Sequence, residues 1–372
     1  MQGTINKVTP YYLNHLQNNA EMLTKGGWSR PKQFSHPDEE VNTVRNHVGL
    51  IDAHSMGKFR VIGADAFEFM QTLSTNDLNR AEIGSLSIYT CLCNHSGGIV
   101  DDVVIYPLSN NELFFITNTL SRQRVSDWLN QMKLELNSDV HILDTTNLDA
   151  YLAIQGPKSK ALVNEILNGE SNLPYFGFKN VEVYGVKTLL ARTGYTGEYG
   201  YELIYPSEYG FEMWNKISEV GEKYGLKPIG GIAIQKLRSE KSYRSHGNDM
   251  TIENNPIEMG LGWTVRFEKE YFIGKESLEE IKKSNNNDLF VGFECEVDEA
   301  ISVPANIYFD GNSAGKITTS YYSPTLNKVI AMGLISRDFA DASHFSLDNS
   351  NESNLRKVEI PFYDPKGEKC KG

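Results

Sequence analysis

The chain has 372 residues, a hydrophobic fraction of 40% and a formal net charge of -12. This length exceeds one ordinary hydrophobic core and predicts two or three domains. The acidic balance, without any block of lysine and arginine, argues against a nucleic-acid partner, and no apolar run approaches the ~20 residues that cross a bilayer, so a membrane partner is not expected either.

Two further properties restrict the class of protein. The first residues lack the basic start and apolar core of a signal peptide, which predicts a cytoplasmic location. The cysteines form neither a CxxC pair nor a cluster with histidine, so a zinc site and a disulfide framework are both disfavoured and no bound metal is expected. The four cysteines are Cys91, Cys93, Cys295 and Cys370.

The first part of the chain has the pattern of an α+β domain. A short helix is predicted to begin near Thr9 and to be followed by a loop that ends at residues 26–31. Residues 58–136 then predict a strand, a helix, three strands and a second helix. This order indicates a mainly antiparallel sheet.

The strand predicted at 99–106 carries two adjacent carboxylates, Asp101 and Asp102, within an apolar β-branched run. Neighbouring strand residues face opposite sides, and both sides of this strand are apolar, so at least one carboxylate is expected in a low-dielectric wall. There it either has dedicated hydrogen-bond donors or a raised pKa that suits proton transfer. Alternation alone does not distinguish the two aspartates, and one of them could simply bind amides of the preceding turn.

A second chemically dense stretch is the hairpin predicted at 188–205. Its loop carries Gly194, Gly197 and Gly200, which let the backbone approach a ligand, and neighbouring tyrosines offer flat faces to a ring. The pattern is typical either of a holder for an aromatic group or of an ordinary glycine-rich turn. It is not a phosphate-binding loop.

The remaining elements complete the domain pattern. Helices are predicted at 211–224 and 232–243, and a strand at 260–267. Residues 284–288 form the best linker candidate. The short strands beyond it, separated by glycine, asparagine and proline turns, predict a small β-barrel or jelly-roll domain.

Motifs along nearly the whole chain resemble the aminomethyltransferase family, which comprises the glycine-cleavage T-protein and related folate-binding domains. The matching stretches lie at 9–28, 52–57, 75–77, 97–102, 155–157, 192–198, 237–240 and 323–326. The resemblance implies an α+β three-lobed cloverleaf with antiparallel sheets. It also implies a folate-binding region at 1–283, with lobes interleaved as roughly 1–50 plus 137–230 and 51–136 plus 231–283, and a C-terminal β-barrel domain at 284–372.

The function implied by this resemblance is tetrahydrofolate-dependent one-carbon transfer. A methylene or methyl group would move to tetrahydrofolate from an amine or a lipoyl-bound donor, so the partner would be a small one-carbon donor or a lipoylated carrier protein. Matched residue by residue, the catalytic aspartate of the family falls on Asp102, the second of the pair. The positions implied for folate binding are Tyr89, Val104, Asn118, Phe176, Tyr195, Glu202, Arg238 and Trp263.

The chain departs from the T-protein pattern at one place. The T-protein sequence Gly-Ala-Arg-Asp is replaced by residues 232–235, so that Ile234 stands where an arginine is expected. Because arginine can hold an anionic group through two hydrogen bonds, its loss predicts poor activity with the carrier-bound donor and better activity with a small methylated or methylene-bearing amine. Lys241 or Arg244 could replace the missing charge.

Two alternatives therefore stand beside the leading interpretation. Residues 240–244 and 251–256 are similar to the folate domains of dimethylglycine and sarcosine dehydrogenases, which favours a free-standing demethylase of a methylated nitrogen, sulfur or oxygen compound. The other alternative is a non-catalytic folate-binding factor for iron–sulfur assembly. That class carries a cysteine in its Lys-Gly-Cys-Tyr-Thr-Gly signature, whereas residues 192–195 here read Arg-Thr-Gly-Tyr.

Overall fold

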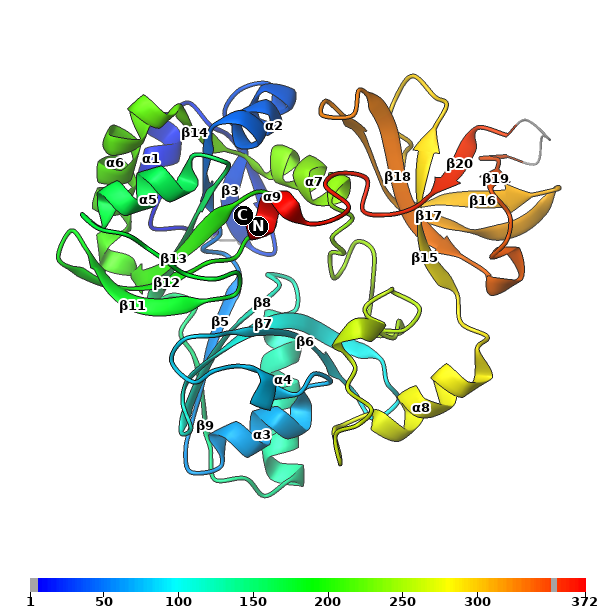
Figure 1. The fold of residues 1–372 in the computed structure, drawn as a ribbon, viewed down its shortest axis with the longest axis horizontal. Coiled ribbons are helices and arrows are strands. Elements are labelled where there is room, and N and C mark those ends of the chain that lie inside the picture. Colours follow the sequence, from blue (N-terminus) through cyan, green and yellow to red (C-terminus); the bar gives the residue numbers. More distant parts are fainter. Residues whose placement is uncertain (1–5, 349–352) are drawn as a thin grey trace, which may run out of the picture.

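The computed structural model describes residues 6–348 and 353–372, and its ribbon forms three lobes around a common centre (Figure 1). One lobe is built on a six-stranded sheet in the order β11-β12-β13-β10-β4-β14. The strands of this sheet are β4 (Val48–Asp52), β10 (Asp149–Gln155), β11 (Phe178–Val183), β12 (Val186–Ala191), β13 (Gly200–Pro206) and β14 (Leu226–Ile229). Its helices are α1 (Tyr12–Gln17), α2 (Pro37–Asn46), α5 (Ser159–Ile166) and α6 (Gly210–Gly221).

The segment after α1 differs from the predicted loop. It forms an antiparallel hairpin of β2 (Glu21–Lys25) and β3 (Trp28–Gln33), and β1 (Lys7–Val8) adds to β3 as a third, parallel strand. The turn uses Gly26 and Gly27, whose φ angles of 60° and 78° favour glycine. The adjacent glycines therefore indicate a tight hairpin turn rather than a longer loop.

The second lobe confirms the element order predicted for residues 58–136. Its five-stranded sheet runs β6-β7-β8-β5-β9, and α3 (Ala66–Leu73) and α4 (Arg122–Glu135) pack against it. The strands are β5 (Gly57–Ile62), β6 (Ile88–Cys93), β7 (Ile99–Ser109), β8 (Glu112–Thr117) and β9 (His141–Asp144). Because β9 pairs with β5, the approximate lobe boundary at residue 137 falls too early, and the chain returns to the first lobe only after this strand.

The third lobe is a nearly closed barrel with strand order β16-β17-β18-β15-β20-β19. A bridge between Tyr308 and Ser346 joins its two ends. The strands are β15 (Leu289–Cys295), β16 (Ala305–Phe309), β17 (Asn312–Ser323), β18 (Lys328–Ile335), β19 (His344–Phe345) and β20 (Leu355–Val358). The predicted α+β fold with antiparallel sheets and a C-terminal barrel is confirmed.

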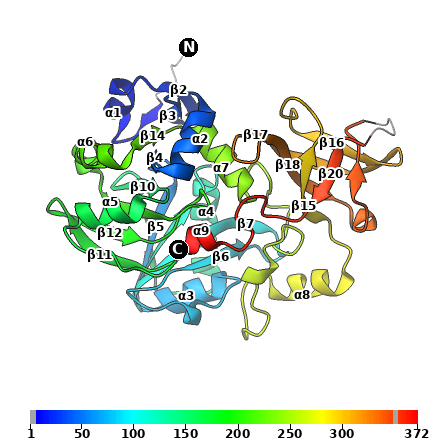
Figure 2. The same cartoon turned by 45° about the horizontal axis from the view of Figure 1, so that its top comes forward.

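Three helices connect the barrel to the other lobes. Helix α7 (Gly231–Glu240) packs against β3 and β17, while α8 (Lys275–Ser284) precedes the barrel. Helix α9 (Glu368–Lys371) ends the chain and lies near the centre of the molecule in both views (Figure 1 and Figure 2). Over the two described ranges, no helix has the length and apolar character needed to cross a membrane.

The strand predicted at 260–267 is wrong. The segment folds as a loop with one 3-10 turn, Gly262–Thr264, and Gly260 has a φ of 65° that interrupts an extended run. The amide of Arg266 donates to the carbonyl of Thr75 instead of joining a sheet. The apolar residues of this loop, Leu261 and Val265, are buried by contact with the second lobe and the barrel.

Candidate active site

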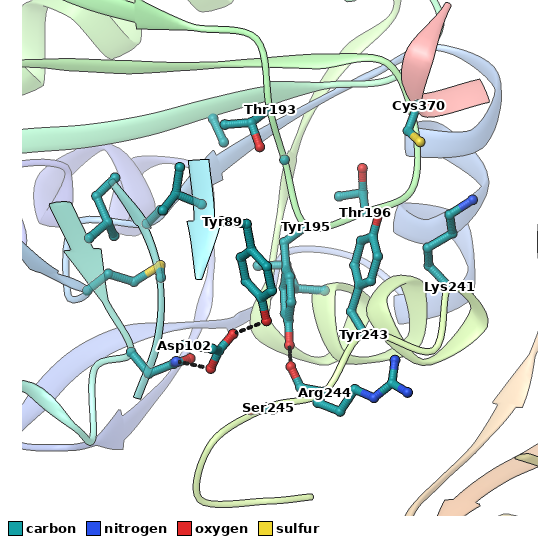
Figure 3. A pocket seen from close by; sticks show the side chains of 18 of the residues that line it. Tyr89, Asp102, Thr193, Tyr195, Thr196, Lys241, Tyr243, Arg244, Ser245 and Cys370 are labelled. Atoms are coloured by element: carbon teal, nitrogen blue, oxygen red, sulfur yellow. Dashed lines mark hydrogen bonds between the residues drawn. The ribbon is translucent and has the colours of Figure 1, made fainter. Parts of the chain in front are cut away.

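A cavity of about 970 Å³ lies at the centre of the molecule, with walls from all three lobes, and part of it is seen in Figure 3. Its volume is at the upper end of the range for small-molecule sites, ~300–1,000 Å³. Eight of the nine predicted site residues line it: Tyr89, Asp102, Val104, Asn118, Phe176, Tyr195, Glu202 and Trp263. The exception is Arg238.

Strand β7 presents one face to this cavity. Asp102, Val104 and Tyr106 are alternate residues of this strand, and all three line the cavity. Tyr89, on the neighbouring strand β6, pairs with Val104 and lines the cavity as well. Asp101 points to the other side, where it is completely buried. Strand alternation therefore separates the two carboxylates, and the tertiary structure assigns the cavity face to Asp102.

The two aspartates have different hydrogen-bond partners. Asp102 accepts from the hydroxyl of Tyr89 at 2.8 Å (Figure 3) and from Nδ2 of Asn118 at 3.0 Å. Asp101 accepts from the backbone amide and from Nδ2 of Asn118, each at 2.9 Å. Asp101 thus holds the Asn118 side chain in the position from which it reaches Asp102.

Burial also changes the protonation of this pair. It raises the pKa of Asp102, although the hydrogen bonds from Tyr89 and Asn118 and the charge of Arg244 oppose the shift. Burial and the neighbouring charge of Asp102 raise the pKa of Asp101 to about 7. A carboxylate that faces a cavity and whose pKa is raised by burial is suited to general acid–base chemistry.

Glu202 is a further buried carboxylate that lines the cavity. It lies on β13 between Ala153 and Ala191 of the neighbouring strands, whose small side chains leave room beside it. The hydroxyl of Tyr151 donates to one carboxylate oxygen, and that of Tyr106 donates to the other at 3.4 Å. Burial raises the pKa of Glu202 to about 7 despite these two donors.

The raised pKa of Glu202 predicts a pH effect on stability. The folded protein keeps this proton up to about pH 7, whereas the unfolded chain loses it near pH 4.3, so stability from this group falls as the pH rises between these values. Urea unfolding at pH 5 and at pH 8 gives the free energy of unfolding that each protein loses between the two pH values. This loss should be smaller in Glu202→Gln than in wild type by on the order of 3 kcal/mol. Equal losses in the two proteins would contradict the raised pKa.

Aromatic side chains provide flat surfaces in the same cavity. Tyr89 stacks on Trp263 with ring centres 5.5 Å apart and 20° between the planes, and Tyr195 stacks on Tyr243 at 5.6 Å and 19°. The hydroxyl of Tyr195 donates to the carbonyl of Arg244 at 2.5 Å (Figure 3). Trp263 is 57% exposed, so it forms an accessible aromatic edge of the cavity.

The backbone of Phe176 is also held in a special conformation. Its φ of 65° is unusual for a large residue, and its amide donates to the carbonyl of Arg192 at 2.9 Å. The amide and hydroxyl of Ser87 both donate to its carbonyl. The backbone that carries this cavity aromatic is therefore held from both sides.

Arg238 does not line the cavity, so the folate-binding position that the resemblance implied for it is corrected. Its side chain is 1% exposed and pairs with Asp249 at 2.7 Å. It also donates to the carbonyl of Tyr243, to Gln235 and to Thr319 of the barrel. The guanidinium is used inside the protein, where it ties α7 to β17.

Two groups of cavity residues were not assigned to the site from the sequence. The segment that follows the barrel also contributes to the wall, although nothing local in its sequence indicates a site. Its lining residues are Ile360, Pro361, Pro365, Lys366, Gly367, Cys370 and Lys371. Lys25 and Arg30 of the β2–β3 hairpin also face the cavity. Alternation along a correctly predicted hairpin would have placed these two cations on one face.

Comparison with known proteins agrees with this architecture. The model of the GCVT N-terminal domain matches residues 11–269, and that of the glycine cleavage T-protein C-terminal barrel domain matches residues 289–364. The chain belongs to the glycine cleavage T-protein family. The aminomethyltransferase of Caldanaerobacter subterraneus subsp. tengcongensis is 37% identical over 339 residues, which cover 90% of this chain and 89% of that protein. The aminomethyltransferase of Thermoanaerobacter sp. strain X514 is 37% identical over 362 residues, which cover 95% of each chain.

A solved member of the family has the same fold. The glycine cleavage system aminomethyltransferase T from Bartonella henselae superposes with a TM-score of 0.88 at 24% identity, over 96% of this chain and 98% of that one. Family membership and the prediction of a transferase of the aminomethyltransferase type are confirmed. Within the described residues, histidine, cysteine, aspartate and glutamate form no group that could hold a metal ion.

Proposed function

We propose that this T-protein family member transfers a one-carbon group to tetrahydrofolate bound in the central cavity. The observation that carries the proposal is the placement of Asp102 and Glu202 in one cavity that also contains two stacked aromatic pairs. Glu202 can accept hydrogen bonds from the N–H groups of a pterin, and the tyrosines can pack on its flat ring. The cavity volume of about 970 Å³ accommodates a molecule of this size.

Tetrahydrofolate supplies the nitrogen nucleophile that takes up the carbon. Asp102 is placed to accept the proton that this nitrogen releases while the new N–C bond forms. The same carboxyl can return that proton to the donor atom whose bond to carbon breaks, so a methyl transfer from an amine balances without an oxidant or reductant. Tyr89 and Asn118 orient Asp102 during the exchange through their hydrogen bonds at 2.8 and 3.0 Å.

A small donor is favoured over a lipoyl-bound one by the region around Ile234. Ile234 lines the cavity, but it packs into an apolar cluster with α2 and offers no hydrogen-bond donor from its side chain. Lys241 is paired with Asp364 at 2.7 Å, and Nε of Arg244 donates to the carbonyl of Met259. Both cations line the cavity, but these contacts already engage them, which disfavours their use in place of the arginine that the T-protein pattern places at 234.

Calorimetric titration with tetrahydrofolate tests the acceptor. Wild type is expected to bind, and Glu202→Ala should weaken binding about fivefold to more than a hundredfold, because an unpaired buried polar group costs ~1–3 kcal/mol. Glu208→Ala, which removes an exposed glutamate of the same lobe, is the matched control and should bind as wild type does. Failure of wild type to bind would contradict the proposed function, whereas equal affinities would remove Glu202 from the site.

A further inference from the structure

Two cations of the β2–β3 hairpin face the central cavity. In the hairpin register, Leu23 pairs with Arg30 and Lys25 pairs with Trp28. Paired and next-but-one residues share a face, so Lys25 and Arg30 are diagonal neighbours on the same side of the hairpin. Both side chains line the cavity.

Neither of these cations has a carboxylate partner among the ion pairs of residues 6–348 and 353–372. Nη1 of Arg30 donates to the hydroxyl of Ser55 at 2.9 Å. The nearby acid Asp52 accepts instead from Nε2 of His15 at 2.8 Å and from the amide of His54 at 2.9 Å.

The electrostatics of the pair are those of an anion site. Burial lowers the pKa of Lys25, and the positive charges of Arg30 and Arg238 lower it further. Burial also lowers the pKa of Arg30, although Asp52 opposes the shift. Two partly desolvated cations that repel each other are stabilised when an anion binds between them.

A chain of contacts connects Arg30 to the Asp102 side of the cavity. Ser55, which accepts from Arg30, contacts the hydroxyl of Thr119 at 3.1 Å. Thr119 directly follows Asn118, whose Nδ2 donates to Asp102. A ligand held by Arg30 is therefore a few side chains from the carboxyl that exchanges protons.

Helix α7 closes this part of the cavity without adding charge. It packs against β3, and the first turn of the helix meets the backbone of Lys32 and Gln33, so Ile234 belongs to the wall next to the hairpin. We propose that Lys25 and Arg30 form a subsite for the carboxylate of a small one-carbon donor of the N-methyl amino-acid class. The inference rests on the proposed function and names the donor for the same cavity.

The experiment compares a donor with and without its carboxylate. Dimethylglycine has one, whereas N,N-dimethylethanolamine carries a neutral hydroxyl in its place. Binding of each compound is measured by calorimetry, and methyl transfer to tetrahydrofolate by product formation. Wild type should bind and use dimethylglycine at least tenfold better, since a hydrogen bond to a charged group contributes ~1.5–3 kcal/mol.

Arg30→Gln and Lys25→Gln should each raise Kd and KM for dimethylglycine about tenfold or more, without changing the Kd of tetrahydrofolate. Lys32→Gln removes a cation of the same strand that lies outside the cavity and pairs with Glu21, so it should behave as wild type. Circular dichroism confirms that the variants fold.

Three results would overturn the subsite. The first is the absence of any preference for dimethylglycine in wild type. The second is unchanged binding of dimethylglycine in the Arg30 and Lys25 variants. The third is weaker tetrahydrofolate binding by the Arg30 and Lys25 variants, together with unchanged binding of a tetrahydropterin that lacks the glutamate arm. That result would assign the cations to the folate tail. In each case tetrahydrofolate binding by wild type would still support the proposed function.

Discussion

Asp102→Asn is expected to lower turnover by about 10²–10⁴-fold, the usual contribution of a general acid–base group. Asparagine keeps the shape of the side chain and can still contact Tyr89 and Asn118, but it cannot take up the proton that a folate nitrogen releases. The affinity for tetrahydrofolate should therefore stay close to that of wild type. Single-turnover kinetics with saturating tetrahydrofolate, together with calorimetric Kd values, separate the two effects.

Asp101→Asn is the matched control for this prediction. Asp101 is buried on the opposite face of β7 and contacts the reacting groups only through Asn118, which donates to both carboxylates. Its replacement should disturb the position of Asn118 and lower turnover less than Asp102→Asn does. A larger loss for Asp101→Asn would reverse the assignment of roles within the pair.

Arg238→Met is expected to destabilise the protein by about 3–5 kcal/mol, because removal of one partner leaves a buried charge unpaired. The side chain of Asp249 is 0% exposed, and without Arg238 only hydroxyl and amide donors would remain beside it, from Thr318, Thr319 and the amide of Ser245. Urea unfolding of wild type and variant gives the difference in free energy.

The folate affinity of folded Arg238→Met should be unchanged, since Arg238 does not line the cavity. Arg80→Met, which changes an exposed arginine, is the control and should leave both stability and binding intact. A variant with normal stability and at least tenfold weaker tetrahydrofolate binding would restore the folate-binding role that the resemblance implied for Arg238.

The C-terminal segment shows how distant parts of the chain complete the cavity. The hydroxyl of Tyr363 donates to Glu198 at 2.7 Å, and its ring lies under the guanidinium of Arg45 at 3.9 Å. Arg192 donates to the carbonyl of Cys370 at 2.7 Å. These contacts join the end of the chain to the first lobe, so residues beyond the barrel form part of the cavity wall.

Local sequence patterns by themselves determined the family and most of the elements, although not the β2–β3 hairpin or the loop at 260–267. Alternating apolar residues and turn signals predicted the strand and helix order at 58–136, because side-chain periodicity is a property of neighbouring residues. Motifs in a fixed order predicted the T-protein resemblance, and with it a cavity that contains Asp102, Tyr195 and Glu202. The fold class and these three cavity positions could thus be predicted from the sequence.

Only the tertiary structure decided which charged groups face the cavity. Both sides of β7 are buried, so hydrophobicity could not distinguish Asp101 from Asp102, and before the structure only the family resemblance singled out Asp102. Arg238 resembled a ligand-binding residue until the barrel placed Thr319, 81 positions away, beside it. Lys25 and Arg30 likewise became a candidate anion site only in the folded protein. Whether a cation is paired depends on groups that folding brings from remote parts of the chain, and local periodicity carries no information about those groups.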